Sequence, residues 1–321
     1  MSAARTRLAP LRLNTRFEPR VWGSTRLGSD DEPIGEGWGA YEGNTIASGP
    51  LDGRTLAEAC EQFGADLLGA PAVQRFGKRF PILTKLLDTS DWLSVQVHPN
   101  DEQALLLEGD GFVGKTEAWH MLETAPGAEI ILGLRSGIDM AQFTEAIRGG
   151  RTLDVIARRT ATAGDTWYIP AGTVHALGPG IFLYEVQQSS DLTYRVYDWD
   201  RPASAGRELH LDQAIQCVDP SRGERTPMPD AQPGELVKLV ACPYFQLDRL
   251  ALVPGGSADL DTRGESFQAV TVVGGSVVIH SGAGETSIGS HETVVVPAST
   301  GSYQIESEAE VALMISSIPV N

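Results

Sequence analysis

The feature that most constrains this fold is a succession of short apolar segments, each of strand length and separated by turn residues. After residue 235 they recur at intervals of roughly eight to twelve residues, a rhythm typical of a β-sandwich or jelly roll. A second series lies between residues 81 and 216 and has the same β-like character. It comprises DWLSVQVHP, AEIILGL, DTWYIP, IFLYEVQQ and LTYRVYDW. The chain is therefore predicted to be mainly β.

Helices are expected only as insertions in the N-terminal half. Residues 55–69 have the apolar spacing of a helix, with Thr55 as N-cap and Glu58 completing a capping box. A second helix is expected in NDEQALLLEG, with Asn100 or Asp101 as its cap. A third covers residues 139–160, broken by a pair of glycines. These insertions decorate a sheet and do not alternate regularly with its strands.

A polar, Pro-rich stretch divides the chain. Residues 221–235 read as a linker. They separate a larger domain, residues 1–220, from a smaller β domain, residues 236–321. The smaller domain contains His280 and His291, but their spacing is not that of metal ligands. We therefore expect residues 236–321 to form a non-catalytic companion domain.

Charge and composition exclude several classes of partner. The formal net charge is −17, and no run of Lys and Arg provides an electrostatic footprint for nucleic acid or an anionic membrane. An acidic surface also opposes anionic ligands. A phosphorylated substrate would therefore require a local basic pocket that overcomes the global field.

Cysteine usage and hydropathy indicate the compartment. Cys60, Cys217 and Cys242 lie far apart, which fits neither a disulfide framework nor a CxxC metal site. The N-terminus lacks the apolar core of a signal peptide, and no apolar run reaches membrane-spanning length. Reduced thiols and a cytoplasmic location are expected.

Candidate metal ligands occur in two strand-like segments. In LSVQVHPND, strand alternation places Gln96 and His98 on one face. In GKTEAWHML the same alternation brings Lys115 and Glu117 to one side. Each pattern alone is also typical of a solvent-facing strand or a surface ion pair.

The segment GDTWYIPAGTVHALG predicts where in the fold these residues come together. Gly164, Pro170, Gly172 and His175 match the second cupin signature, G-x5-P-x-G-x2-H, although the Asn that often closes it is absent. Gly and Pro shape a turn between barrel strands, and the His then points into the barrel mouth. The predicted fold is therefore two cupin-like β-jelly-roll domains with helical insertions in the N-terminal half.

A barrel brings distant strands to a common interior, where four side chains would form a ligand set. They are Gln96, His98, Glu117 and His175. Two imidazoles, a carboxylate and an amide oxygen suit zinc, with iron, manganese or nickel as alternatives.

Downstream, Asp191, Thr193 and Arg195 occupy alternate positions, and their side chains face the same way if the segment is extended. Such an Arg and carboxylate form a structural ion pair or, near a metal, handle protons or phosphate.

Together the segments SVQVHPND, GKTEAW, IPAGTVHAL and DLTYRVYDWDR resemble, in that order, the type I phosphomannose isomerases. The resemblance also includes VWGSTRLG and FPILTKLLD and covers most of residues 15–205. It implies a zinc-dependent intramolecular oxidoreductase of carbohydrate metabolism, with one Zn²⁺ per chain. The enzyme would interconvert mannose 6-phosphate and fructose 6-phosphate through an enediol.

The resemblance also implies roles for individual residues. Gln96, His98, Glu117 and His175 match the family's metal ligands. Lys115, Asp191 and Arg195 match positions associated with ring opening, proton transfer or substrate contact, without a division of roles among them.

Departures from the family pattern leave alternatives open. Where the family has an acidic and a hydroxyl residue, the stretch GEGWGAYEGNTIASG has Gly39 and Tyr41, and His120 replaces a common Tyr. One alternative is therefore an isomerase or epimerase of an unphosphorylated or different sugar. Another is a non-enzymatic sugar-binding or regulatory cupin. An iron-dependent oxygenase suits Gln96 and the pair of Lys115 and Glu117 poorly.

Overall fold

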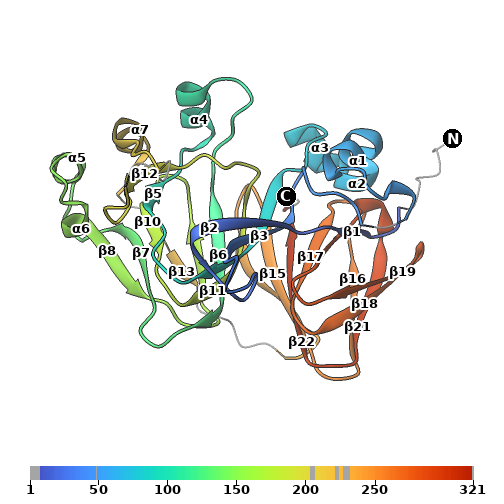
Figure 1. Cartoon of the computed structure of the whole chain (residues 1–321). Helices are drawn as coiled ribbons and strands as arrows, with labels where there is room; N and C mark the ends of the chain where they lie inside the picture. The colour runs from blue at the N-terminus through green and yellow to red at the C-terminus, as the bar shows by residue number, and fades with distance from the viewer. Residues whose placement is uncertain (1–7, 48, 203–206, 221–223, 227–231, 320–321) are drawn as a thin grey trace. The chain divides into compact units, whose positions relative to one another are not determined.

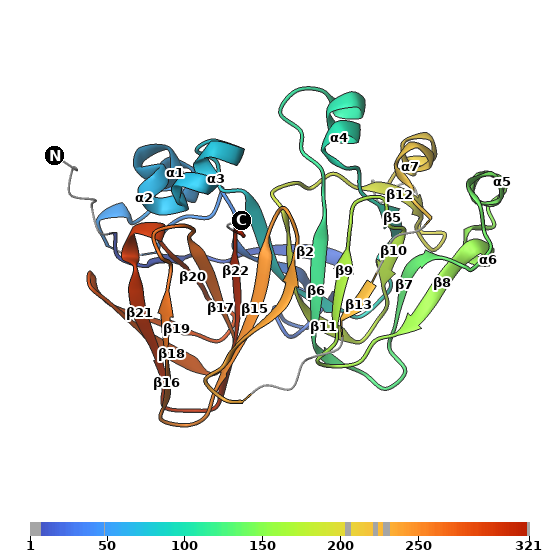
Figure 2. The same cartoon turned by 180° about the vertical axis from the view of Figure 1, so that it is seen from behind.

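The computed structural model describes residues 8–47, 49–202, 207–220, 224–226 and 232–319 (Figures 1 and 2). The chain is mainly β, as predicted. It packs as two compact units. The terminal unit comprises residues 1–16, 37–86 and 228–321, and the central unit comprises residues 17–36 and 87–227. The domain boundaries at residues 220 and 236 remain predictions, because a division of the chain into compact units does not test them.

The terminal unit contains two antiparallel sheets that enclose an apolar core. Alternate residues of both sheets point inward, among them Leu250, Val270, Ile279, Ile305 and Leu313. The larger sheet has the order β1 (Leu11–Leu13), β20 (Thr293–Val296), β17 (Gln268–Gly274), β22 (Val311–Ser317), β15 (Gln246–Leu252) and β14 (Leu236–Ala241). The smaller has the order β16 (Gly256–Asp261), β21 (Ser302–Ser307), β18 (Ser276–Ser281) and β19 (Gly284–Gly289).

Short helices lie at one end of this sandwich (Figure 1). The predicted helix at 55–69 is present as α1 (Leu56–Phe63) and α2 (Ala65–Leu68), followed by α3 (Ala70–Phe76). The capping box is confirmed: the Glu58 amide donates to Thr55 Oγ1 and the Thr55 amide donates to the Glu58 carboxylate. The helix is interrupted at Gly64, whose φ of 46° lies outside the right-handed helical region. The 3-10 turns are η1 (Gly49–Leu51) and η3 (Ala298–Thr300).

The strands of the central unit lie in two further sheets. One has the order β12 (Tyr194–Tyr197), β5 (Val95–Val97), β10 (His175–Leu177), β7 (Glu129–Leu134) and β8 (Ile156–Thr160). The other has the order β13 (Glu224–Thr226), β9 (Thr166–Ile169), β6 (Glu117–Thr124), β11 (Ile181–Gln188), β4 (Ile82–Thr89), β2 (Arg16–Ser24) and β3 (Ile34–Ala40). Apolar side chains from both sheets, including Trp119, Leu132 and Leu183, form one buried cluster.

The helical insertions of this unit follow the prediction in part. Asn100 caps α4 (Asp101–Glu108), and its side chain accepts from the Gln103 amide at 2.8 Å. The third predicted helix is wrong beyond residue 155: α5 (Met140–Arg148) and α6 (Thr152–Val155) are followed by a strand, β8. The glycine pair ends α5, and β8 then pairs with β7, which satisfies its backbone.

Sequence reading missed α7 (Leu211–Cys217), which packs with α5 against the five-stranded sheet (Figure 2). Strand β4 is buried at all eight positions, so the alternation that marks a half-exposed strand is absent. Of the predicted linker, 221–223 and 227–231 lie outside the described residues, and 224–226 form β13. Within the residues described, none of the helices is long and apolar enough to span a bilayer.

Candidate metal centre

Three neighbouring strands carry a row of polar side chains on one face of their sheet. His175 at the start of β10 pairs directly with Gln96 on β5, and Arg195 on β12 pairs with the same residue. Directly opposed residues of antiparallel strands project from the same face of a sheet. His175, Gln96 and Arg195 therefore face one compartment. His98 follows the end of β5 and lies near the same place.

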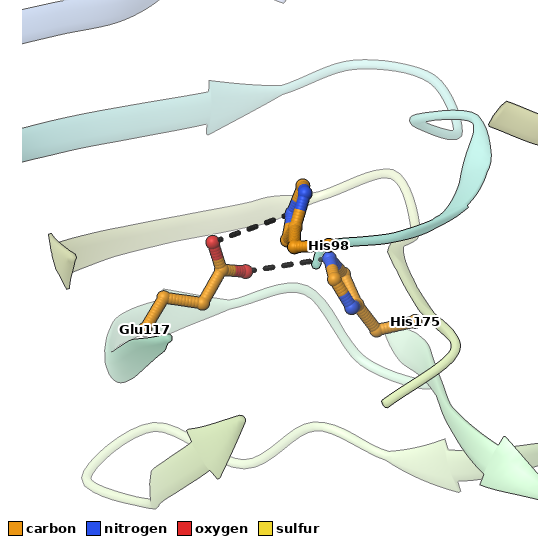
Figure 3. A group of neighbouring side chains, drawn as sticks. All are labelled: His98, Glu117 and His175. Atoms are coloured by element: carbon orange, nitrogen blue, oxygen red, sulfur yellow. Dashed lines mark ion pairs between the residues drawn. The ribbon is translucent and has the colours of Figure 1, made fainter. Parts of the chain in front are cut away.

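Glu117 approaches His98 and His175 from the other sheet (Figure 3). Its Oε1 lies 3.3 Å from His175 Nε2 and its Oε2 lies 3.6 Å from His98 Nε2. Ligand atoms of the three residues lie within 4.8 Å of one another, and each side chain is 1% exposed. They come from separate segments of the chain, so only the folded central unit brings them together.

Backbone carbonyls fix the orientation of both imidazoles. His98 Nδ1 lies 2.7 Å from the Leu192 carbonyl oxygen, and His175 Nδ1 lies 2.8 Å from that of Thr173. An Nδ1–H that donates to a carbonyl leaves the lone pair on Nε2. Both Nε2 atoms face Glu117. Proteins commonly orient metal-binding histidines in this way, through a hydrogen bond from the ring nitrogen that does not bind the metal.

The chemistry of this group fits a divalent cation. Burial lowers the pKa of His175 to about 4, so its ring is neutral near pH 7 and its Nε2 can donate electrons. Glu117 Oε2 is buried, and the described atoms that it faces are His98 Nε2 and Lys115 Nζ. Two neutral imidazoles and a carboxylate are a common zinc donor set, and geometry rather than affinity selects among the divalent ions.

Lys115 lies against the same group. Its Nζ is 3.2 Å from Glu117 Oε2 and 3.1 Å from His98 Nε2, and the residue is 5% exposed. The alternation read from the sequence placed Lys115 and Glu117 on one side of the strand, and their side chains do meet. A buried amino group beside a carboxylate can take up and return a proton within a closed site.

Gln96 borders the group from β5. Its Nε2 lies 3.3 Å from His175 Nε2, and Ser94 Oγ donates to its Oε1 at 3.2 Å. The amide oxygen and nitrogen are nearly equivalent in shape, and a half-turn exchanges them. After that exchange the oxygen would face the space beside His175.

Other residues singled out in the sequence lie differently. Asp191 is exposed, and its backbone carbonyl accepts from Thr193 Oγ1 at 3.3 Å. His120 Nδ1 lies 3.0 Å from Thr166 Oγ1, on the opposite side of β6 from Glu117. The position of Arg195 in the row places it at the site, whereas Asp191 lies before the start of β12.

Two further residues lie near the site: Glu185, which the sequence prediction missed, and His210, which was judged to lack the spacing of a metal ligand. Glu185, on β11, accepts from Trp119 Nε1 at 2.7 Å, and the Trp119 ring packs edge-on against His175 at 5.4 Å. His210 accepts from the Arg195 amide through Nδ1 at 3.3 Å. A lone carboxylate inside the apolar run IFLYEVQQ was the signal for Glu185. No pattern in the sequence distinguishes His210.

Packing accounts for one departure from the family pattern. In the terminal unit, a Cβ at Gly39 would lie 2.3 Å from Thr293 Oγ1, so a larger residue would clash. The Tyr41 ring packs edge-on against Trp38, with 5.0 Å between centroids. Glycine at position 39 is therefore required by its neighbour, irrespective of any substrate.

Comparison with known proteins gives one consistent family. Residues 12–112 match the model "Phosphomannose isomerase type I, catalytic domain". The chain is 36% identical over 315 residues to the mannose-6-phosphate isomerase ManA of Bacillus subtilis, covering 94% of this chain and 97% of that protein. A mannose-6-phosphate isomerase of Streptococcus mutans is 32% identical, with 94% and 96% covered.

A solved structure agrees. The crystal structure of the mannose 6-phosphate isomerase from Bacillus subtilis superposes with a TM-score of 0.82 and 30% identity, covering 96% of this chain and 99% of that one. The sequence similarity spans nearly the full length of both proteins, and the fold agrees over the same extent. The chain therefore belongs to the type I phosphomannose isomerase family.

Proposed function

We propose that this protein is a metal-dependent isomerase that interconverts mannose 6-phosphate and fructose 6-phosphate through an enediol. The observation that carries the proposal is the buried group of His98, Glu117 and His175, with both Nε2 atoms facing one carboxylate. It lies in a chain 36% identical to a mannose-6-phosphate isomerase. Zinc is the proposed metal, one ion per chain, with Gln96 as the fourth ligand through its amide oxygen.

When bound, a divalent cation supplies a positive charge that stabilises the oxygens of an enediol. His98, Glu117 and His175 would hold it, oriented by the carbonyls of Leu192 and Thr173. Their burial keeps bulk water from the reacting carbons, which strengthens every electrostatic interaction in the site.

Proton transfer is assigned to Lys115. Aldose–ketose interconversion removes a proton from C2 and adds one to C1, so a single base that takes and returns the proton suffices. Lys115 Nζ is buried within 3.2 Å of Glu117, whereas Asp191 is exposed. These positions favour Lys115 Nζ as the base. Asp191 remains a candidate for contact with the substrate at the rim.

Arg195 is proposed to bind the substrate's anionic end. Its guanidinium is permanently charged and suits phosphate oxygens. It lies one strand from Gln96 and two strands from His175 in the same row. A sugar phosphate held by Arg195 would extend its carbonyl end toward the metal ligands. The ligand is thus a small sugar phosphate, in an intramolecular oxidoreduction within carbohydrate metabolism.

The remaining assignments follow from composition. A charge of −17 and the absence of basic runs in the sequence argue against nucleic acid or membrane partners. Three separated cysteines fit a reducing compartment, and we propose the cytoplasm. Catalysis is assigned to the larger of the two domains proposed from the sequence, residues 1–220.

The experiment is coupled turnover by metal-stripped protein, with mannose 6-phosphate and free mannose, before and after addition of zinc, manganese or iron. We expect zinc to restore conversion of the phosphate ester, and His175→Ala to remain inactive with zinc present. Conversion of free mannose at a comparable rate would favour an isomerase of unphosphorylated sugars. Metal binding without turnover of either sugar would instead favour a sugar-binding cupin.

A further inference from the structure

Among the described residues, no carboxylate forms an ion pair with Arg195, although the charge of Asp198 acts on it from further away. The residue is half-buried, and its Nε is fully enclosed without a hydrogen-bond partner among the described residues. An arginine presents five N–H donors and cannot become neutral at physiological pH, so an enclosed Nε–H without an acceptor is costly. A bound anion would supply both the acceptor and the missing negative charge.

The carboxylate nearest in sequence, Asp198, is engaged elsewhere. Arg207 Nε lies 2.5 Å from Asp198 Oδ2, and Arg207 Nη2 lies 3.0 Å from Oδ1. Arg201 Nη1 reaches the same Oδ1 at 3.0 Å. Asp198 is 5% exposed, so both of its oxygens are occupied inside the protein. The guanidinium of Arg207 contacts both oxygens of the Asp198 carboxylate, and this two-point contact fixes the orientation of the carboxylate.

Arg207 belongs to the segment that flanks β12. The backbone amide of His210, three residues further on, donates to the Arg195 carbonyl at 2.8 Å. Arg207 and Asp198 thus sit beside Arg195. Burial lowers the pKa of Arg195, as do the charges of Arg207 and Arg20, while Asp198 partly opposes them. Arg20 is itself held by Glu36 and Glu18 at 2.8 and 3.1 Å.

We propose that Arg207 is a positioning residue for the substrate's phosphate: it keeps Asp198 engaged, so that Arg195 stays unpaired and free to bind the anion. The inference rests on the proposed function and adds to it. Arg201 and Arg207 share Asp198, and Arg201 also contacts Asp91 at 2.7 Å. The positive charge that remains for a dianion is therefore that of Arg195 itself, which would offset the acidic field of the protein locally.

Replacing Arg207 should therefore weaken the binding of an anion by Arg195 and leave the metal ligands unchanged. In Arg207→Gln, Asp198 has one partner fewer and is available to Arg195, which then competes with phosphate. We expect the Kd of inorganic phosphate, measured by calorimetry on the zinc-loaded protein, to rise about tenfold. The KM for mannose 6-phosphate should rise by the same factor, whereas kcat changes less than about twofold.

Asp198→Asn separates positioning from a merely structural ion pair. If Arg207 acts by occupying Asp198, the Asn variant keeps or tightens phosphate binding, because the competing charge is gone. If the pair only supports the fold, both variants weaken phosphate binding alike, and that result would overturn the proposal. Arg207→Lys, which keeps the charge but loses the fork, should fall between the parent and the Gln variant.

Arg26→Gln is the matched control. Arg26 also makes a two-point contact with a carboxylate, Glu123 at 2.6 and 2.5 Å, within the central unit. We expect its Kd for phosphate and its KM to equal those of the parent. Unchanged values in Arg207→Gln would refute the inference. If the parent binds phosphate but does not convert mannose 6-phosphate, the proposed function fails, while the binding comparison still decides the role of Arg207.

Discussion

The central and terminal units share an architecture and differ in what lies between their sheets. Each encloses apolar residues between antiparallel sheets. In the terminal unit the apolar cluster runs through β15, β17, β18 and β22, and the carboxyl of Asp248 on β15 is buried. In the central unit the same kind of interior also receives His98, Lys115, Glu117 and His175. Metal chemistry therefore depends on a few inward positions and not on the fold.

The terminal unit shows that His and Glu together do not suffice. His280, on β18, lies between two glutamates: its Nδ1 is 3.2 Å from Glu285 and its Nε2 is 3.2 Å from Glu306. The two nitrogens thus face different carboxylates, and the side chain is 34% exposed. A metal ion requires donors that converge on one point. At His175 the second nitrogen is instead held by the backbone.

The largest expected effect tests this contrast directly. His175→Ala removes a ligand and should reduce turnover of mannose 6-phosphate by about a thousandfold or more, with loss of bound zinc. His280→Ala removes a histidine with two carboxylate neighbours, Glu285 and Glu306, and should leave both unchanged. Turnover and metal content of the two purified variants provide the measurement. A similar loss in both would mean that the terminal unit takes part in catalysis.

The second prediction concerns stability in the terminal unit. Leu313 is fully buried in its core, and Leu313→Ala should lower the free energy of unfolding by about 2–5 kcal/mol, because it leaves a cavity. Folded Leu313→Ala should keep its kcat for mannose 6-phosphate. Leu183→Ala, at a fully buried site in the central unit, is the counterpart. Denaturant unfolding and kcat would be compared. A kcat reduced only in Leu313→Ala would contradict a purely structural terminal core.

A buried carboxyl in the terminal unit gives the third prediction. Burial raises the pKa of Asp248 to about 6, against about 3.9 for an ordinary Asp. The folded state therefore binds this proton more tightly than the unfolded chain does. The contribution of Asp248 is most favourable below about pH 4 and is lost as the pH rises to about 6. At pH 8 the cost is at most about 3 kcal/mol.

Asp248→Asn should accordingly be more stable than the parent at pH 8 and equal to it at pH 4. Urea unfolding between those values provides the measurement. The side chain keeps its neighbour Gln246, which donates to both carboxylate oxygens in the parent. In the central unit, the corresponding change Glu117→Gln should abolish activity instead. A stability difference between Asp248→Asn and its parent that does not vary with pH would exclude titration of Asp248 as the cause.

Much of this contrast could be predicted from the sequence, for a physical reason. Strand alternation and the G-x5-P-x-G-x2-H spacing are local, and they identified His98, Glu117 and His175, which the fold brings together. Glu185 was missed because its meaning depends on Trp119, on a neighbouring strand. Strand β8 was misread because its pairing with β7, and not its local pattern, decides its conformation. Both features depend on contacts between residues far apart in the sequence, and local sequence patterns do not predict such contacts.

The smallest predicted effect compares two helix caps. Thr55 caps α1 in the terminal unit and Asn100 caps α4 in the central unit, each with a complete capping box. Replacing either with Ala should lower the free energy of unfolding by about 1 kcal/mol.

Asn100, however, is two residues from His98, and α4 lies between the chain positions of His98 and Lys115. Disorder introduced there reaches the ligands, whereas disorder at Thr55 stays in the terminal unit. Zinc affinity should therefore fall several-fold in Asn100→Ala and stay at the parent value in Thr55→Ala. Equal zinc affinities at equal loss of stability would show that the ligands are held by their strands and carbonyl contacts alone.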